Sequence, residues 1–112
     1  MSFELITSER FDVQIKRLSK RYPSFKEDLR LFESELLENP MQGVEIAPHI
    51  RKIRMTIHSK GRGKSGGARV ITCNALISEK DGKIGLLLIY DKADVSNVKI
   101  NVIKDIMKEI GL

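Results

Sequence analysis

Residues 52–58 read Lys52-Ile53-Arg54-Met55-Thr56-Ile57-His58, and this segment is the main indication of the fold class. Apolar and polar side chains alternate along it, as in a strand whose successive residues point to opposite faces of a sheet. Its apolar residues predict one covered face, and its polar and basic residues predict an outward face. Before Pro48, apolar residues recur instead at the spacing of a helix. The chain is therefore expected to change from helices to strands at this point.

Two amphipathic helices are predicted in the N-terminal part of the chain. Ser8 can cap the first helix, whose apolar residues recur at steps of three and four. Pro23 ends it, because proline lacks an amide hydrogen. The second helix carries an apolar stripe and ends before Pro40. Since only a short break separates them, the two helices are expected to form a hairpin. Alternation within residues 2–7 predicts a short strand before them.

Two more strands are predicted after residue 58. Ser59–Gly67 is rich in glycine and basic residues, and we expect it to be a flexible loop. The next strand runs from about Ala68 to Ile77, and Asp81-Gly82 is a turn signal before a strand from Ile84 to Tyr90. Within the latter, Leu86–Ile89 is a continuous apolar run, which is typical of a central strand covered on both faces.

The C-terminal segment predicts a last helix, which Ser96 or Asn97 can cap and Gly111 can end. The order of elements is thus strand, two helices, three strands, helix. This order predicts an α+β fold with an N-terminal strand and helical hairpin packed on a small antiparallel or mixed β-sheet, followed by a C-terminal helix. A chain of 112 residues is expected to form a single domain, spanning residues 1–112.

Positive charge is concentrated in one part of the chain. Between Ile46 and Ser78 there are seven lysines and arginines and no acidic residue, whereas the rest carries 13 basic and 15 acidic residues. Such asymmetry is typical of a surface that binds polyanions, with a merely solvated charged face as the alternative. Aromatic residues make up only 5% of the chain, which argues against a binder of single strands that depends on base stacking.

Several other classes of protein are disfavoured by the composition. Cys73 is the only cysteine and is expected to be a small apolar residue in a strand, so no internal disulfide or cysteine-rich metal site is possible. His49 and His58 are the only histidines, and no acidic residue near them favours a metal site. The glycines match neither the P-loop nor the dinucleotide-binding spacing. No signal peptide and no apolar run of about 20 residues is present, so we expect a cytoplasmic protein. We also expect that it has no cofactor.

Four basic residues are expected to gather on one face of the sheet. Lys52 and Arg54 would lie about 7 Å apart on the same side of their strand. Arg69 begins the neighbouring strand and Lys92 follows the last one, so hairpin geometry would bring both to the same face. Grouped cations bind phosphate and stabilise the charge that develops in phosphoryl transfer, and a lysine among arginines can act as a general base. Lys64, in the glycine-rich loop, is a further candidate for contact with phosphate.

Three segments follow one another in this order: Arg51-Lys52-Ile53-Arg54, then Gly61-Arg62-Gly63-Lys64-Ser65-Gly66-Gly67-Ala68-Arg69-Val70-Ile71, then Leu86-Leu87-Leu88-Ile89-Tyr90-Asp91-Lys92. Together they resemble the HigB-type branch of the RelE/ParE toxins, and the likeness extends over nearly the whole chain. The resemblance implies a RelE-like fold and the toxin of a type II toxin–antitoxin system, an endoribonuclease that cleaves messenger RNA in the ribosomal A site. In the implied reaction, the ribose 2′-hydroxyl of the RNA attacks the adjacent phosphate, and no metal is used. The products are a cyclic phosphate and a free 5′-hydroxyl. The implied partners are a cognate antitoxin, messenger RNA and the ribosome.

The resemblance also implies roles for individual residues. Lys52 would be the general base or electrostatic activator of the hydroxyl, Arg54 and Arg69 would stabilise the pentacoordinate phosphate, and Lys92 would complete the catalytic group. Other residues are candidates for binding RNA or phosphate: Arg51, His58, Lys60, Arg62, Lys64 and Tyr90.

Two departures from the family concern proton transfer and base binding. Ala93 follows Lys92, where some members carry an arginine, and the last helix lacks the tyrosine that stacks on the substrate base in those members. The acid that protonates the leaving oxygen is therefore open among His58, Lys92 and Tyr90. Two alternative functions also stay open, a ParE-like inhibitor of DNA gyrase and a non-catalytic module that binds an antitoxin or nucleic acid. The sequence predicts no oligomeric state.

Overall fold

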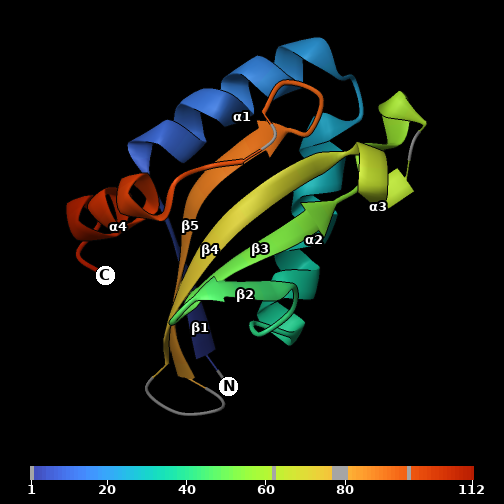
Figure 1. Cartoon of the computed structure of the whole chain (residues 1–112). Coiled ribbons are helices and arrows are strands. Elements are labelled where there is room, and N and C mark those ends of the chain that lie inside the picture. The colour runs from blue at the N-terminus through green and yellow to red at the C-terminus, as the bar shows by residue number, and fades with distance from the viewer. Residues whose placement is uncertain (1, 62, 77–80, 96) are drawn as a thin grey trace.

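The computed structural model describes residues 2–61, 63–76, 81–95 and 97–112. Its centre is a five-stranded sheet in the order β1-β5-β4-β3-β2 (Figure 1). The strands are β1 (Ser2–Thr7), β2 (Val44–Ala47), β3 (Ile50–Met55), β4 (Ala68–Leu76) and β5 (Asp81–Asp91). β1 runs parallel to β5, and every other neighbouring pair is antiparallel. The sheet is therefore mixed, and the predicted α+β fold is confirmed.

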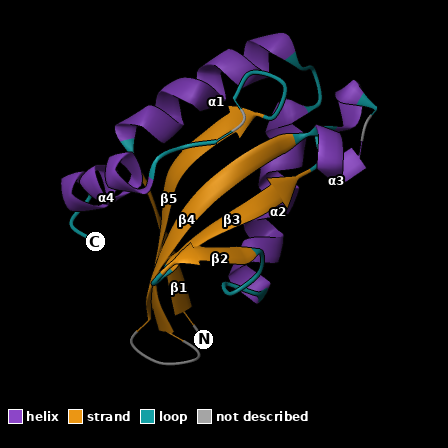
Figure 2. Cartoon of the chain, viewed as in Figure 1, coloured by secondary structure: helices purple, strands orange, loops and turns teal. Residues whose placement is uncertain are grey.

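Helices cover the sheet on both faces (Figure 2). α1 (Glu9–Arg21) and α2 (Phe25–Glu38) pack on one face, and α4 (Ile100–Glu109) packs on the other. The predicted N-cap is confirmed, because the amide of Phe11 donates to Ser8 Oγ at 3.0 Å. Ser8 also ties α1 to the sheet, since its hydroxyl donates to the carbonyl oxygen of Leu87 at 2.6 Å. None of the helices in the described part of the chain is long and apolar enough to cross a membrane.

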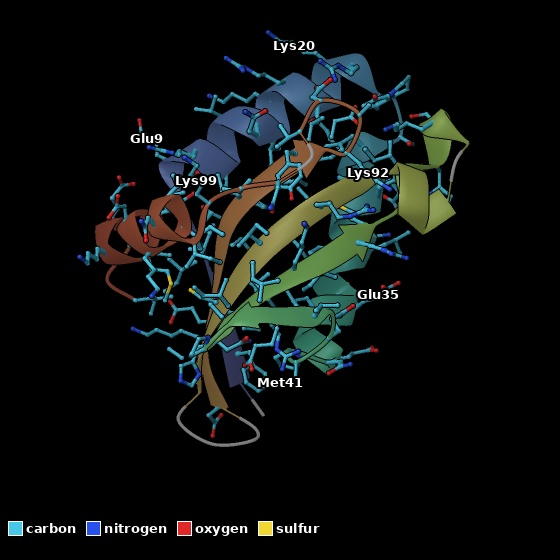
Figure 3. The ribbon with its side chains drawn as sticks, viewed as in Figure 1. Glu9, Lys20, Glu35, Met41, Lys92 and Lys99 are labelled. Carbon is cyan, nitrogen blue, oxygen red and sulfur yellow. The ribbon has the colours of Figure 1, made fainter. Side chains whose placement is uncertain are left out.

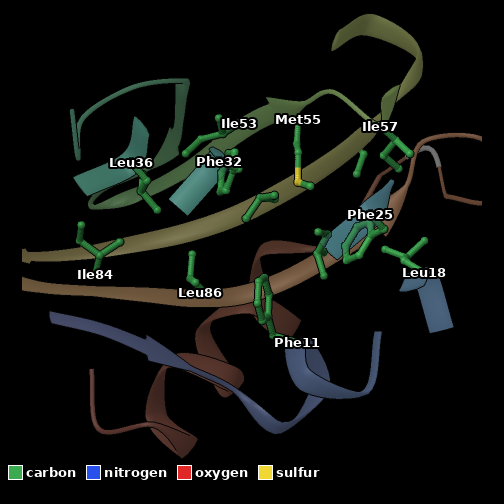
Figure 4. Packing of buried hydrophobic residues seen from close by; sticks show 13 residues of the cluster. Phe11, Leu18, Phe25, Phe32, Leu36, Ile53, Met55, Ile57, Ile84 and Leu86 are labelled. Carbon is green, nitrogen blue, oxygen red and sulfur yellow. The ribbon is translucent and has the colours of Figure 1, made fainter. Parts of the chain in front are cut away.

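The larger core lies between the sheet and the first two helices (Figure 4). Phe11 and Phe25 are fully buried there against aliphatic residues of β3, β4 and β5. Leu86 faces this core, whereas Leu87 belongs to the smaller core under α4. Successive residues of a strand point to opposite faces, so Leu86 and Leu87 face different cores. The register shift with β4 at Leu87 lets Ile89, three residues after Leu86, face the larger core as well. The prediction that β5 is covered on both faces is confirmed.

Two predictions between the helices and β4 are wrong. No strand is predicted between the second helix and Pro48, but β2 forms there and pairs with β3, with a register shift after Glu45. The flexible loop expected at Ser59–Gly67 contains two helical turns, η1 (His58–Lys60) and α3 (Gly63–Gly66). Strand β3 itself ends at Met55, so the alternation of outward residues does not extend to His58. Local hydrogen bonds, such as that from Gly61 N to His58 O at 3.0 Å, replace strand pairing in this segment.

The C-terminal boundaries also differ from their predictions. Asp81-Gly82 is not a turn, because both residues pair with β1 inside β5; the C-terminal end predicted for the preceding strand, Ile77, lies outside the described residues. The last helix starts at Ile100, later than a cap at Asn97 requires, and Ser96 lies outside the described residues. The helix starts later than predicted because Val95 and Val98, which precede it in the chain, pack against the smaller core. Its end is as predicted.

The stop at the end of α4 follows from one backbone conformation. Gly111 has a φ of 78°, its amide donates to Lys108 O at 3.1 Å, and the amide of Leu112 donates to Met107 O at 2.9 Å. This pair of hydrogen bonds is the Schellman arrangement, which requires a left-handed residue after the helix. Because α4 lies over one end of the sheet only, the face of β3 and β4 nearer to α3 is left uncovered (Figure 1).

Candidate functional site

A pocket of about 870 Å³ lies on this uncovered part of the sheet. Four of the residues that line it are Lys52, Arg54, Arg69 and Lys92, which come from β3, β4 and the segment after β5. These are the four residues to which the sequence analysis gave catalytic roles. We refer to the hollow that they line as the cationic pocket. In Figure 3, Lys92 lies over the open face of the sheet near α3.

The register of the strands brings these cations together. Arg54 on β3 is paired directly with Arg69 on β4, and Arg69 is in turn paired with Tyr90 on β5. Lys92 is held beside them by its amide, which donates to the carbonyl oxygen of Gly67 at 3.1 Å. Gly67 is required here for a steric reason, because a Cβ atom on it would lie 2.0 Å from the carbonyl oxygen of Met55.

Arg69 is the most deeply placed of the four cations. It is 7% exposed, whereas Arg54 and Lys92 are exposed. Burial lowers the pKa of its guanidinium, and the positive charge of Arg54 lowers it further. Its Nη1 donates to the carbonyl oxygen of Ala68 at 3.2 Å. A cation in such a site is poorly solvated and is therefore a strong electrostatic partner for a phosphate.

Tyr90 lies beside Arg69 on the neighbouring strand and is also buried, with 7% of its surface exposed. Burial raises the pKa of its phenol, while the nearby charge of Arg69 acts in the opposite direction. Within the described part of the chain, its hydroxyl group makes no hydrogen bond. Tyr90 packs in the smaller core rather than lining the cationic pocket.

Aliphatic side chains also line the cationic pocket. They are Val44 and Ile46 on β2 and Val95 after β5. Val44 is 68% exposed, and its pairing with Lys52 places it on the open face. The pocket thus combines groups suited to anions with aliphatic groups suited to an apolar ring. The strand that supplies Val44 and Ile46 was missed in the sequence, although the alternation of these two residues was a signal for it.

Other predicted binding residues lie outside the cationic pocket. The ammonium group of Lys60 lies 2.6 Å from Asp91 Oδ1, and its side chain is only 9% exposed. Arg51 points to the other side of β3 and donates to the carbonyl oxygen of Gly43 at 3.3 Å. Arg62 lies outside the described residues, and so does the side chain of Lys64.

Asp91 is a buried structural centre that the sequence analysis did not identify. Its carboxylate accepts hydrogen bonds from Lys60, from the hydroxyl of Tyr22, from Arg21 Nη1 at 3.2 Å and from the amide of Ala93 at 3.0 Å. Burial alone would raise its pKa, but these partners outweigh burial and hold the pKa at about 2. The ion pair joins η1 and the end of α1 to the end of β5. The signal in the sequence was an acidic residue directly after an apolar strand.

His58 contacts a second buried acid, Asp28 of α2, through its ring nitrogen Nδ1. Asp28 is 4% exposed, whereas the side chain of His58 is 67% exposed. The expectation that His58 continues the outward face of Lys52 and Arg54 on one strand is wrong, because β3 ends at Met55 and the chain turns toward α2, and His58 does not line the cationic pocket. Asp28 was also missed, although a carboxylate three residues after Phe25 and four before Phe32 stands out within an apolar helical stripe.

Among the residues that the structure describes, no three His, Cys, Asp or Glu side chains are grouped so that they could hold a metal ion. The site is characterised by its cations: two lysines and two arginines line one pocket, and one of the arginines is buried.

The comparison with known protein families found no family model that matches the sequence.

Proposed function

We propose that this protein is an endoribonuclease of the RelE/ParE type, the toxin of a type II toxin–antitoxin system. Its substrate would be messenger RNA in the ribosomal A site, and its partners would be the ribosome and a cognate antitoxin. The observation that carries the proposal is the convergence of Lys52, Arg54, Arg69 and Lys92 on one pocket. The family resemblance of the same segments supports it, and both lead us to place the protein in the cytoplasm.

The proposed reaction is an attack of the ribose 2′-hydroxyl on the adjacent phosphate. Lys52 takes the proton of the hydroxyl or lowers the energy of the developing alkoxide. Arg54 and Arg69 stabilise the additional negative charge on the pentacoordinate phosphate, since preorganised donors in a poorly solvated site act most strongly where charge develops. Lys92 contributes a further positive charge at the rim. The products are a 2′,3′-cyclic phosphate and a 5′-hydroxyl.

The aliphatic lining of the pocket fits the same substrate. A nucleobase has two apolar faces, and Val44, Ile46 and Val95 line the same pocket as the cations. A nucleotide could therefore place its phosphate on the arginines and one face of its base on an aliphatic side chain. Such packing would replace the aromatic stacking for which the chain has few residues.

The first experiment is controlled expression of the wild type and of a Lys52→Ala/Arg69→Ala double variant, with growth recorded and RNA 5′ ends mapped. We expect growth arrest and new cuts within translated messages for the wild type only. A Lys16→Ala/Lys104→Ala variant is the matched control, because it removes two positive charges from exposed positions on α1 and α4. It is expected to behave like the wild type.

The other outcomes separate the alternative functions. Arrest with intact messages and a DNA-damage response, retained in the double variant, would indicate a gyrase inhibitor. Absence of arrest for the wild type would indicate a binding module. Cuts that persist in the double variant at the wild-type rate would show that the nuclease does not use the cationic pocket.

A further inference from the structure

A hydrogen-bonded pair, His58 and Asp28, lies next to the cationic pocket and has no part in the reaction as described so far. Asp28 Oδ1 contacts His58 Nδ1, and Asp28 Oδ2 accepts from the amide of His58 at 3.0 Å. The hydroxyl of Ser24 donates to the same Oδ2 at 2.6 Å. The buried carboxylate of Asp28 thus contacts both the backbone amide and the imidazole ring of His58.

This arrangement determines which ring nitrogen can react. When Nδ1 carries a hydrogen that is donated to a carboxylate, the ring is fixed in orientation and Nε2 is the nitrogen left for a substrate. Burial would raise the pKa of Asp28, but the hydrogen bonds from Ser24 and His58 outweigh burial and lower it. Asp28 is therefore ionised at neutral pH, and its carboxylate accepts from the backbone amide of His58 while contacting Nδ1 of the ring.

The pair is connected to the cationic pocket through Arg54. A smaller pocket of about 180 Å³ is lined by His58 and Arg54, and the charged side chains that face His58 there are Asp28 and Glu35 of α2 and Arg54 of β3. Arg54 also lines the cationic pocket. Glu35 lies on α2 beyond the β3 edge of the sheet (Figure 3).

The two pockets meet where β3 has an open edge. In the described part of the chain, β2 pairs with β3 only as far as Lys52, so the stretch from Ile53 to Met55 has no neighbour on that side. A strand of RNA can pass round this edge while its phosphate stays on Arg54. Lys52 precedes Arg54 along the chain and His58 follows it, and both have a pocket in common with Arg54: Lys52 the cationic pocket and His58 the smaller one.

We propose that His58 is the general acid of the nuclease and that Asp28 is the residue that positions it. The inference rests on the proposed function. As the 2′-oxygen forms its bond to phosphorus, the bond from phosphorus to the 5′-oxygen breaks and its electron pair passes to that oxygen. The proton on His58 Nε2 moves to the 5′-oxygen, which leaves a neutral imidazole and a 5′-hydroxyl. An in-line displacement requires the base and the acid to act on opposite sides of the phosphate, and a phosphate bound to Arg54 would have Lys52 in one of the two pockets that Arg54 lines and His58 in the other.

The same contacts also have a structural role, because they tie η1 to α2, and the test must separate the two roles. A His58→Asn variant does so, since the asparagine amide can take the place of Nδ1–H toward Asp28 but carries no titratable nitrogen. An Asp28→Asn variant removes the charge that orients the imidazole. The melting temperature of each variant shows whether it is folded.

The decisive substrate is a short messenger RNA with sulfur in place of the bridging 5′-oxygen at the mapped cleavage site, presented on ribosomes. A thiolate leaves without protonation, so a general acid is not needed for it. On the oxygen substrate we expect His58→Asn to slow single-turnover cleavage about 100-fold or more, which is the usual contribution of a general acid. On the sulfur substrate we expect its rate to be close to that of the wild type. Asp28→Asn is expected to show a smaller loss with the same recovery.

Each remaining outcome has one meaning. Equal losses on both substrates, or no loss on the oxygen substrate, overturn the assignment of His58 and leave the nuclease intact. Absence of cleavage by the wild type on the oxygen substrate overturns the proposed function, and the assignment of His58 with it.

Discussion

Arg69 of β4 lies directly opposite Arg54 of β3, and Arg69 is 7% exposed. Like charges at paired positions of neighbouring strands destabilise a sheet, and burial of one of them adds a desolvation cost. The lowered pKa of Arg69 reflects both effects, with burial as the larger and Arg54 as the second. Two cations held together in this way are typical of a functional site, where locally unfavourable interactions are retained because the function needs the charges.

The first prediction follows from this pair. Arg54→Gln should increase the free energy of unfolding by about 0.2–1 kcal/mol, because it removes the like-charge contact. It should also lower the cleavage rate by about 100-fold, as expected for loss of one donor to developing charge. Denaturant unfolding and single-turnover cleavage measure the two effects. Lys104→Gln, exposed on α4, is the control and should change neither. A loss of stability in Arg54→Gln would contradict the repulsion.

Asp91→Asn should destabilise the protein at neutral pH by about 2 kcal/mol or more, because the pKa of Asp91 lies at about 2 in the fold instead of 3.8. The folded pKa is below the unfolded one, so this stabilisation is present above about pH 4–5 and is lost as the pH falls toward 2. Chemical denaturation between pH 7 and pH 2.5 should therefore show a steeper loss for the wild type than for the variant.

The control for Asp91 is Glu27→Gln, which breaks an exposed ion pair with Arg30 on α2. Exposed pairs contribute little to stability, so no resolvable change is expected. Equal pH profiles for the wild type and Asp91→Asn would show that Asp91 does not stabilise the fold through its charge.

Gly67→Ala should destabilise the protein by about 3 kcal/mol, because the added Cβ must displace the backbone of Met55. It should also impair cleavage, since Gly67 O holds the amide of Lys92. Gly61→Ala is the matched variant in the same segment: its Cβ meets nothing within 4 Å, and only its φ of 69° is unfavourable, at a cost of about 1 kcal/mol. Equal losses in the two variants would argue against close packing at Gly67.

The thiol of Cys73 should resist alkylation in the native protein. It is 1% exposed, and burial raises its pKa to about 11, so little thiolate forms at pH 8. Reaction with a thiol reagent should follow the rate of global unfolding and become fast in denaturant. Fast labelling of the native protein would show that β4 opens locally.

Much of the architecture follows from local patterns in the chain. The alternation around Ile53, the break at Pro23, the cap at Ser8 and the stop at Gly111 each act through the backbone conformation of a few neighbouring residues. They therefore predicted the helices, most of the strands and the α+β class. The weakest predictions were turns and boundaries, such as Asp81-Gly82, because pairing with a distant strand, β1, overrides the preference of a dipeptide for a turn.

For the candidate site, the sequence showed which side chains carry positive charge and that Lys52 and Arg54 point to one side of a strand. The contacts of these cations followed from the folded structure. Register brought Arg69 opposite Arg54, Asp91 bound Lys60 inside the fold, and Asp28 drew His58 toward α2. Each of these contacts joins residues that are distant along the chain. The physical reason is that charge and alternation are properties of neighbouring residues, whereas burial and partnership depend on which segments pack together.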